Sequence, residues 1–258
     1  MNRVPYIGIT DFMTFEQVER MRLVLNENIL PWEESRRLHV GVMMSYKTLN
    51  EIPTKWSSAF PRKEDIAGIF ASPFTMNCLH YADYDGVDVE ENLVRAVGYG
   101  GSGLSALQLD MLWPDPAAII KAVVVATQPI EVIVQVGKQA IEQSGDNPAE
   151  IVSRLQDYVH VAHHVLIDKS MGKGLGMDAQ ALLPFARAIR EAFPQFGLVA
   201  AGGLGPNSVA LVKPLVREFS DISIDAQGKL RPTGSALDPI DWDMAGSYLR
   251  QAAMLMLV

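Results

Sequence analysis

The sequence predicts one (β/α)₈ barrel, the TIM-barrel architecture of the α/β class, spanning residues 1–258. Its 258 residues are close to the ~250 residues typical of such a barrel. Short aliphatic and β-branched runs alternate with longer segments of helical period, which is the pattern of a parallel sheet covered by helices. An open doubly wound sheet would normally carry a G-x-G-x-x-G turn after the first strand, and the sequence has none there. No linker long enough to divide the chain is seen, so we expect a single domain.

The order of elements supports this fold. Eight apolar runs predict strands at residues 4–10, 39–45, 78–82, 104–109, 130–136, 164–167, 198–201 and 221–225. Segments of helical period follow at residues 15–25, 63–70, 89–97, 116–127, 179–193, 206–218 and 241–256, and two shorter helical pieces meet near residues 145–148. Residues 48–73 are irregular and rich in Pro and Ser. We expect them to form a long loop and a short helix.

Composition and charge exclude several classes of protein. The net charge of −8 argues against sequence-independent binding to nucleic acid, which requires clustered Lys and Arg. The most apolar stretches are too short to span a bilayer. The one cysteine, Cys78, excludes a disulfide within the chain and a Cys-rich zinc site, and it fits a reducing compartment. We therefore expect a cytoplasmic protein that has a small-molecule substrate and no cofactor, metal, nucleic acid or membrane partner.

Active sites of such barrels are built from the loops that follow the strands. The polar or glycine positions near the predicted strand ends are Asp11, Lys47, Asp83, Asp110, Gln135, Asp168, Gly202, Gly203 and Asp225.

The loop after the sixth predicted strand is the first candidate for chemistry. Asp168 ends the strand, and the segment that follows contains Gly172, Gly174 and Gly176. A carboxyl group in a partly dry pocket beside such a loop is suited to general acid or base catalysis. The alternative is a carboxylate that only caps a helix or orders the loop.

The glycines after the seventh predicted strand are the second candidate. Gly202 and Gly203 allow the backbone to approach an anion, and backbone N–H groups at the start of the next helix would face it. A phosphate site at this place is common among barrels. The alternative is a tight turn whose helix start is shaped by Asn207 or Ser208.

Two carboxylates follow the fourth and eighth predicted strands and form the third candidate. Asp110 and Asp225 would lie across the barrel mouth from each other. Together with Asp168 they predict an acidic site able to bind a cation or divalent metal. The alternative is that they pair with Lys or Arg in the loops.

The histidines are weaker candidates. His160, His163 and His164 lie near the start of the sixth strand, and hence at the barrel base, which usually serves stability. A metal site from His160 and His164 at i, i+4 is possible on a helix face, but a structural role is favoured. His80 lies within the third strand and faces either the barrel interior or a helix.

The sequence also resembles the phosphoribosylanthranilate isomerase family over most of its length. Residues 6–10, Tyr-Ile-Gly-Ile-Thr, resemble the family's K-I-C-G-I-T, and Gln108-Leu109-Asp110 resembles its Q-L-H. Residues 166–168 and 173–176 resemble its L-L-D and G-G-T-G. Residues 201–209, Ala-Gly-Gly-Leu-Gly-Pro-Asn-Ser-Val, are similar to its A-G-G-L-x-P-x-N-V, and residues 221–223 resemble its D-V-S.

The resemblance implies an Amadori rearrangement of a phosphoribosyl amine. It assigns the catalytic acid to Asp168 and half of a phosphate site to Gly202 and Gly203. Three positions depart from the family. Ile7 stands where the family has the Cys that acts as the catalytic base, Ile224-Asp225 replaces its Ser-Gly, and Asp110 replaces its His. The base must then be another group, with Asp110, Asp225 and Asp11 as candidates.

Our leading expectation is an isomerase-like enzyme for a small sugar derivative, with or without a phosphate. We expect Asp168, Asp110 and Asp225 to be catalytic. The expected ligand-binding residues are Gly202, Gly203, Gly174, Gly176, Lys47 and Gln108.

Two other classes of function stay open. One is a lyase or aldolase with a Schiff base on Lys47 or Lys169, or a metal-assisted enzyme that uses the acidic site. The other is a non-catalytic barrel that binds a small ligand or a protein. The apolar run 252–258 is compatible with a homo-oligomer contact, and also with the packed end of the last helix.

Overall fold

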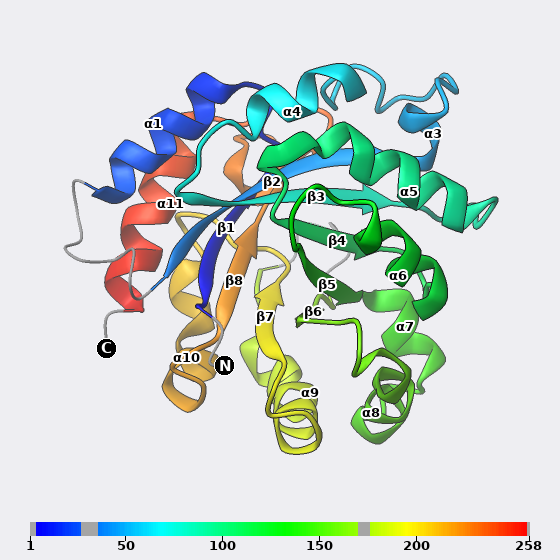
Figure 1. Cartoon of the computed structure of the whole chain (residues 1–258). Coiled ribbons are helices and arrows are strands. Elements are labelled where there is room, and N and C mark those ends of the chain that lie inside the picture. Colours follow the sequence, from blue (N-terminus) through cyan, green and yellow to red (C-terminus); the bar gives the residue numbers. More distant parts are fainter. Residues whose placement is uncertain (1–3, 27–35, 170–175, 257–258) are drawn as a thin grey trace.

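The computed structural model describes residues 4–26, 36–169 and 176–256, and its strands close into one parallel barrel in the order β1 to β8. The strands are β1 (Tyr6–Thr10), β2 (Arg37–Ser45), β3 (Thr75–Ala82), β4 (Ala106–Asp110), β5 (Glu131–Val136), β6 (His164–Ile167), β7 (Gly197–Ala201) and β8 (Ser223–Ala226). Figure 1 shows the helices arranged around the outside of this barrel. The predicted fold class is confirmed.

Helices follow the strands as the barrel requires. The α-helices are α1 (Phe15–Asn26), α3 (Tyr46–Leu49), α4 (Ile66–Ile69), α5 (Val89–Gly100), α6 (Pro116–Val124), α7 (Lys138–Gln143), α8 (Pro148–Leu155), α9 (Ala179–Ala192), α10 (Lys213–Glu218) and α11 (Trp242–Leu255). Asp115, Asn147, Asp178 and Asp241 cap four of them by accepting hydrogen bonds from backbone N–H groups.

Some predicted boundaries differ from the structure. Asp110 is the last residue of β4 and Asp225 lies inside β8, so neither follows its strand as predicted. The predicted helix 206–218 is a 3₁₀ turn, η4 (Val209–Val212), that leads into the short α10. The segment 63–70 is likewise a 3₁₀ turn, η1 (Lys63–Asp65), followed by α4. Pro, Gly and β-branched residues in these segments shorten the helices.

Side chains alternate along each strand between the barrel interior and the layer of helices. On β1, Ile7 and Ile9 belong to the large core between barrel and helices. Tyr6 belongs to the separate interior cluster with Met76, Cys78, Ala106, Ile133, Leu166, Val199 and Ala201. The prediction that Ile7 stands at the position of a catalytic base is therefore wrong, because its side chain faces the helices and not the pocket.

The base of the barrel is closed by an ion-pair cluster. Glu131 of β5 bonds His164 of β6 at 2.6 Å and Arg37 of β2 at 2.7 Å. Burial alone would raise the pKa of Glu131, but hydrogen bonds from His164 and Arg37 bring it down to about 2. The alternative of a metal site formed by His160 and His164 on one helix face is wrong. His164 begins a strand and is bound to Glu131, while His160 is exposed.

The described part of the apolar C-terminal run, residues 252–256, is mostly buried. Ala252, Ala253 and Met256 are buried, while Met254 is exposed. Among the described residues, no helix is both long and apolar enough to cross a membrane.

Candidate active site

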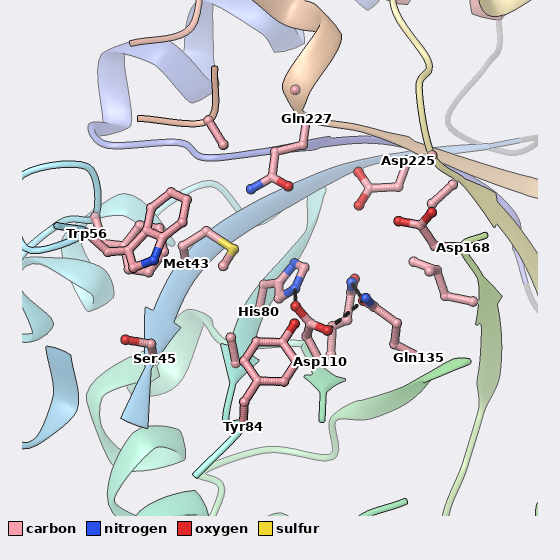
Figure 2. A pocket seen from close by; sticks show the side chains of 18 of the residues that line it. Met43, Ser45, Trp56, His80, Tyr84, Asp110, Gln135, Asp168, Asp225 and Gln227 are labelled. Atoms are coloured by element: carbon pink, nitrogen blue, oxygen red, sulfur yellow. Dashed lines mark hydrogen bonds and ion pairs between the residues drawn. The ribbon is translucent and has the colours of Figure 1, made fainter. Parts of the chain in front are cut away.

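A cavity of about 620 Å³ opens at the carboxyl ends of the strands. Figure 2 shows its polar floor, where side chains from β3, β4, β5, β8 and the loop after β6 point into one space. The predicted residues that line it are Lys47, Gln108, Asp110, Asp168, Gly202, Gly203 and Asp225. Parallel strands bring their carboxyl ends to the same edge, which is why residues so distant in sequence meet here.

Asp225 is the most perturbed carboxyl group of the cavity. Its side chain is 7% exposed and accepts a hydrogen bond from the Thr10 hydroxyl at 3.0 Å. Burial raises the pKa of Asp225 to about 6, against the opposing effects of His80 and Thr10. A carboxyl group with this pKa exchanges protons readily near neutral pH.

The space that Asp225 occupies exists because Gly8 has no side chain. Gly8 is the register partner of Asp225 across β1 and β8. A Cβ atom on Gly8 would lie 2.5 Å from Oδ1 of Asp225 and 3.0 Å from Nδ1 of His39. His39 is fully buried, and its burial, reinforced by His80 and His164, lowers its pKa to about 3. The imidazole beneath Asp225 is therefore neutral.

A row of polar side chains crosses the floor from β3 to β5, joined by one ion pair and two hydrogen bonds. His80 Nε2 lies 3.6 Å from Asp110 Oδ2, and Gln135 Nε2 donates to Asp110 Oδ1 at 2.8 Å. Gln108 Nε2 in turn donates to Gln135 Oε1 at 2.9 Å. Burial alone would lower the pKa of His80, but the nearby Asp110 raises it above its ordinary value. The proximity of Asp110 therefore favours the charged form of this imidazole.

Asp11 plays a different part from the one predicted. Its backbone is left-handed, with φ of 92°, and its carboxylate is bound by Arg231 and by Gln227 Nε2 at 3.0 Å. Burial raises the pKa of Asp11 despite Arg231. Arg231 also donates to the backbone oxygens of Gln227 and Asp238. Asp11 is not among the residues that line the cavity, so it fixes the loop after β8 and is a poor candidate for the base.

An apolar wall covers one side of the cavity. Met43, Phe60 and Ala82 form a small buried cluster against which Trp56 and Ala59 pack. The Trp56 and Phe60 rings are stacked, with centroids 5.6 Å apart. Tyr84 from the loop after β3 points its hydroxyl toward Asp110 (Figure 2), and the lost hydration there together with Asp110 raises the pKa of Tyr84.

Sequence reasoning missed Trp56, Phe60 and Tyr84. They lie in irregular segments, and no periodic signal marks the direction of their side chains. His80 was left undecided. Counting alternate positions along β3 from the interior residues Met76 and Cys78 would have placed it inside the barrel.

The predicted glycines near the cavity have different outcomes. Gly176 is not among its lining residues, and a Cβ atom there would lie near Leu211. Gly174 lies outside the described residues. By contrast, Gly202 and Gly203 line the cavity with φ angles of 100° and 70°. These angles favour glycine and bring bare backbone to the cavity wall.

The lysines give little support to a Schiff base. Lys169 bonds Asp146 at 2.6 Å and lies over the Phe185 ring, and it does not line the cavity. Lys47 lines the cavity, but its half-exposed amine lies 3.5 Å from Asp85. A Schiff-base lysine needs a desolvated amine, whereas both of these amines lie beside carboxylates at partly exposed places.

The three predicted catalytic carboxylates share the cavity without forming a metal cage. Within the described ranges, no group of three or more His, Cys, Asp or Glu side chains is placed to hold a metal ion. The metal-assisted alternative therefore gains no support from these residues.

The fold and the site together define a (β/α)₈ barrel with an acidic pocket at its mouth. Among solved structures, the chain is similar to a mutant tryptophan synthase alpha-subunit from the hyperthermophile Pyrococcus furiosus, with a TM-score of 0.55 and 10% identity over 99% of this chain and 98% of that one. This likeness shows the barrel fold alone and does not single out the phosphoribosylanthranilate isomerase family. No family model and no curated protein matches the chain.

Proposed function

We propose that the protein is an acid–base isomerase that acts on a small sugar derivative carrying an amine. The observation that carries the proposal is Asp225, a buried carboxyl group with a pKa of about 6 that lines a cavity of small-molecule size. General acid–base catalysis is most effective when the pKa of the catalytic group is close to the working pH.

An Amadori rearrangement needs one acid and one base on the same substrate. The acid protonates the ring oxygen as the ring opens to an imine. The base then removes the proton on C2, and protonation of C1 completes the aminoketose. We assign the base to Asp225 and the acid to Asp168, which both line the cavity. His80, held by Asp110, is placed to stabilise a hydroxyl or alkoxide oxygen.

The cavity walls suit a substrate with two different ends. Gly202, Gly203 and Lys229 line one part of the cavity, and an anionic group such as a phosphate would fit there. The apolar wall of Met43, Trp56 and Phe60 would receive a planar or apolar substituent on the amine.

The test is turnover of N-glycosylamines in D₂O, with ribosylamines of aniline both with and without a 5-phosphate. We expect aminoketose to form faster than without protein and to carry deuterium at C1, detected by NMR. Asp225→Asn and Asp168→Asn should each lower the rate about 10²–10⁴-fold. Asp157→Asn, an exposed carboxylate in η3 (Gln156–Tyr158), is the matched control and should keep the full rate.

Two results would contradict the proposal. One is a rate no higher than that without protein for every glycosylamine. The other is full turnover by Asp225→Asn. Binding of these compounds without turnover would favour the non-catalytic barrel.

A further inference from the structure

Gln227 reaches into the cavity from the loop that follows β8, two positions after Asp225. Asp225 lies within β8, and Gln227 comes directly after the last residue of that strand. Both residues line the cavity, and Figure 2 shows the Gln227 amide and the Asp225 carboxyl group both directed into it. The mechanism proposed above uses Asp225 and gives Gln227 no role.

The amide group of Gln227 is held in one orientation. The Oδ2 atom of Asp11 accepts a hydrogen bond from Arg231, and the Nε2 atom of Gln227 lies 3.0 Å from the same oxygen. Because arginine can only donate, Oδ2 is the unprotonated oxygen of Asp11, whether or not Oδ1 holds a proton. This oxygen therefore accepts from Gln227 as well. The NH₂ group of Gln227 must face Asp11, and its Oε1 atom must face away from it.

The Oε1 atom of Gln227 is left as an acceptor for a ligand. Within the described ranges this oxygen receives no hydrogen bond, and it is not one of the enclosed side-chain atoms that lack a partner. It is therefore accessible from the cavity that Gln227 lines. Specificity in small-molecule sites comes from a few polar groups that are fixed in place in this way.

Asp11 and Arg231 form a strained and buried support for this amide. Asp11 has a φ of 92°, in a region that residues other than glycine rarely adopt. Arg231 is buried and also donates to the backbone oxygens of Gln227 and Asp238. Strain of this kind is found mostly at functional sites. Because Asp11 does not itself line the cavity, the group that this support presents to a ligand is the Gln227 amide.

We propose that Gln227 is a specificity-determining residue, whose Oε1 atom accepts a hydrogen bond from the substrate hydroxyl next to the carbon that gives its proton to Asp225. The inference rests on the proposed function. In the rearrangement, the C2 hydroxyl becomes the ketone, and the nitrogen passes through an imine that has no N–H. The C3 hydroxyl keeps its O–H bond in every step. It is therefore the donor beside C2 that a fixed acceptor can hold throughout the reaction.

The experiment compares two unreactive polyol analogues of the aminoketose, N-phenyl-1-amino-1-deoxyribitol and its 3-deoxy form, which differ only in the C3 hydroxyl. Equilibrium binding to the full chain is measured by calorimetry or NMR titration. We expect the 3-hydroxy probe to bind the unaltered protein about threefold to tenfold more tightly, which corresponds to one uncharged hydrogen bond. Gln227→Leu and Gln227→Met should each remove this preference and leave the affinity for the 3-deoxy probe nearly unchanged. Gln251→Leu changes an exposed glutamine of α11 that bonds Ser247; it is the matched control and should keep the preference.

Three results would overturn the inference: equal affinity of the two probes for the unaltered protein, a preference that persists in the Gln227 variants, or no binding of the 3-hydroxy probe at millimolar concentration. The comparison of probes on the unaltered chain stands even if a variant fails to fold. Binding and turnover are separate readouts. A preference that depends on Gln227, with no turnover of glycosylamines, leaves Gln227 as the residue that binds the hydroxyl and removes the isomerase. Turnover without such a preference does the opposite.

Discussion

The histidine–carboxylate pair at the base of this barrel and the pair of His80 and Asp110 at its mouth are built differently. At the base, His164 Nε2 lies 2.6 Å from Glu131, which also binds Arg37. At the mouth, His80 Nε2 lies 3.6 Å from Asp110, whose Oδ1 atom accepts a hydrogen bond from the uncharged amide of Gln135. The base pair is short and has a second cation, whereas the mouth pair is longer and borders a cavity.

The difference shows how one interior serves two purposes. The charges at the base neutralise one another, so that end can be closed. At the mouth, the buried carboxyl group of Asp225 lines an open cavity, and burial raises its pKa to about 6. This division agrees with barrels in general, where the base supports stability and the mouth supports chemistry.

The largest expected effect is on stability, from breaking the base pair. Glu131→Ala leaves His164 and Arg37 without their carboxylate in a largely buried place. Removing one partner of such a cluster should lower the free energy of unfolding by about 4 kcal/mol, measured by urea denaturation. A loss below about 1 kcal/mol would show that the base pair contributes little to the closure of the barrel.

The second effect concerns the pH dependence of stability and comes from Asp225. Its pKa is raised from 3.8 to about 6 on folding, so the folded protein holds this proton more tightly than the unfolded chain. The stability from that proton is complete below pH 4 and is lost as the pH rises through about 6. Across this pH range the free energy of unfolding of the unaltered protein should fall by up to roughly 3 kcal/mol because of Asp225. Asp225→Asn should lack this fall, as measured by urea denaturation of both proteins at each pH. Parallel curves for both would contradict the raised pKa.

The smallest effect sharpens the contrast at the mouth. Because Asp110 raises the pKa of His80, Asp110→Asn should lower that pKa, as followed by NMR of the imidazole nitrogens. The free energy of unfolding should change by less than about 1 kcal/mol, because Asp110 is partly exposed and borders the cavity. An unchanged His80 titration would mean that another group sets its charge.

The order of the strands could be predicted from the sequence, and with it the gathering of Asp110, Asp168, Asp225, Gly202 and Gly203 at one edge. Parallel strands of a closed barrel place their carboxyl ends together whatever the exact register. The direction of single side chains could not be predicted so well. A shift of one residue turns a side chain from the interior to the helices, which is why Ile7 was misplaced.

Contacts between residues far apart in sequence were also hidden. Arg231 binds Asp11 across 220 positions, and no local pattern connects them. The aromatic wall of Trp56 and Phe60 arises in a segment without periodicity, so its direction depends on tertiary packing alone. The catalytic roles assigned to the carboxylates remain predictions for the turnover experiment.

Gly8 on β1 and Asp225 on β8 lie next to the same small space in the barrel interior, and these two strands pair where the barrel closes. A side chain from β1 or one from β8 can fill that space, but both cannot, because a Cβ atom on Gly8 would lie 2.5 Å from the Asp225 carboxylate. The two positions are therefore exchangeable only as a pair. A lineage that moved its reactive group from one strand to the other would have to pass through a state with both side chains small, or tolerate a transient clash. Successive substitutions at these positions would be constrained in their order, and each would be neutral or harmful according to what the other strand already carried.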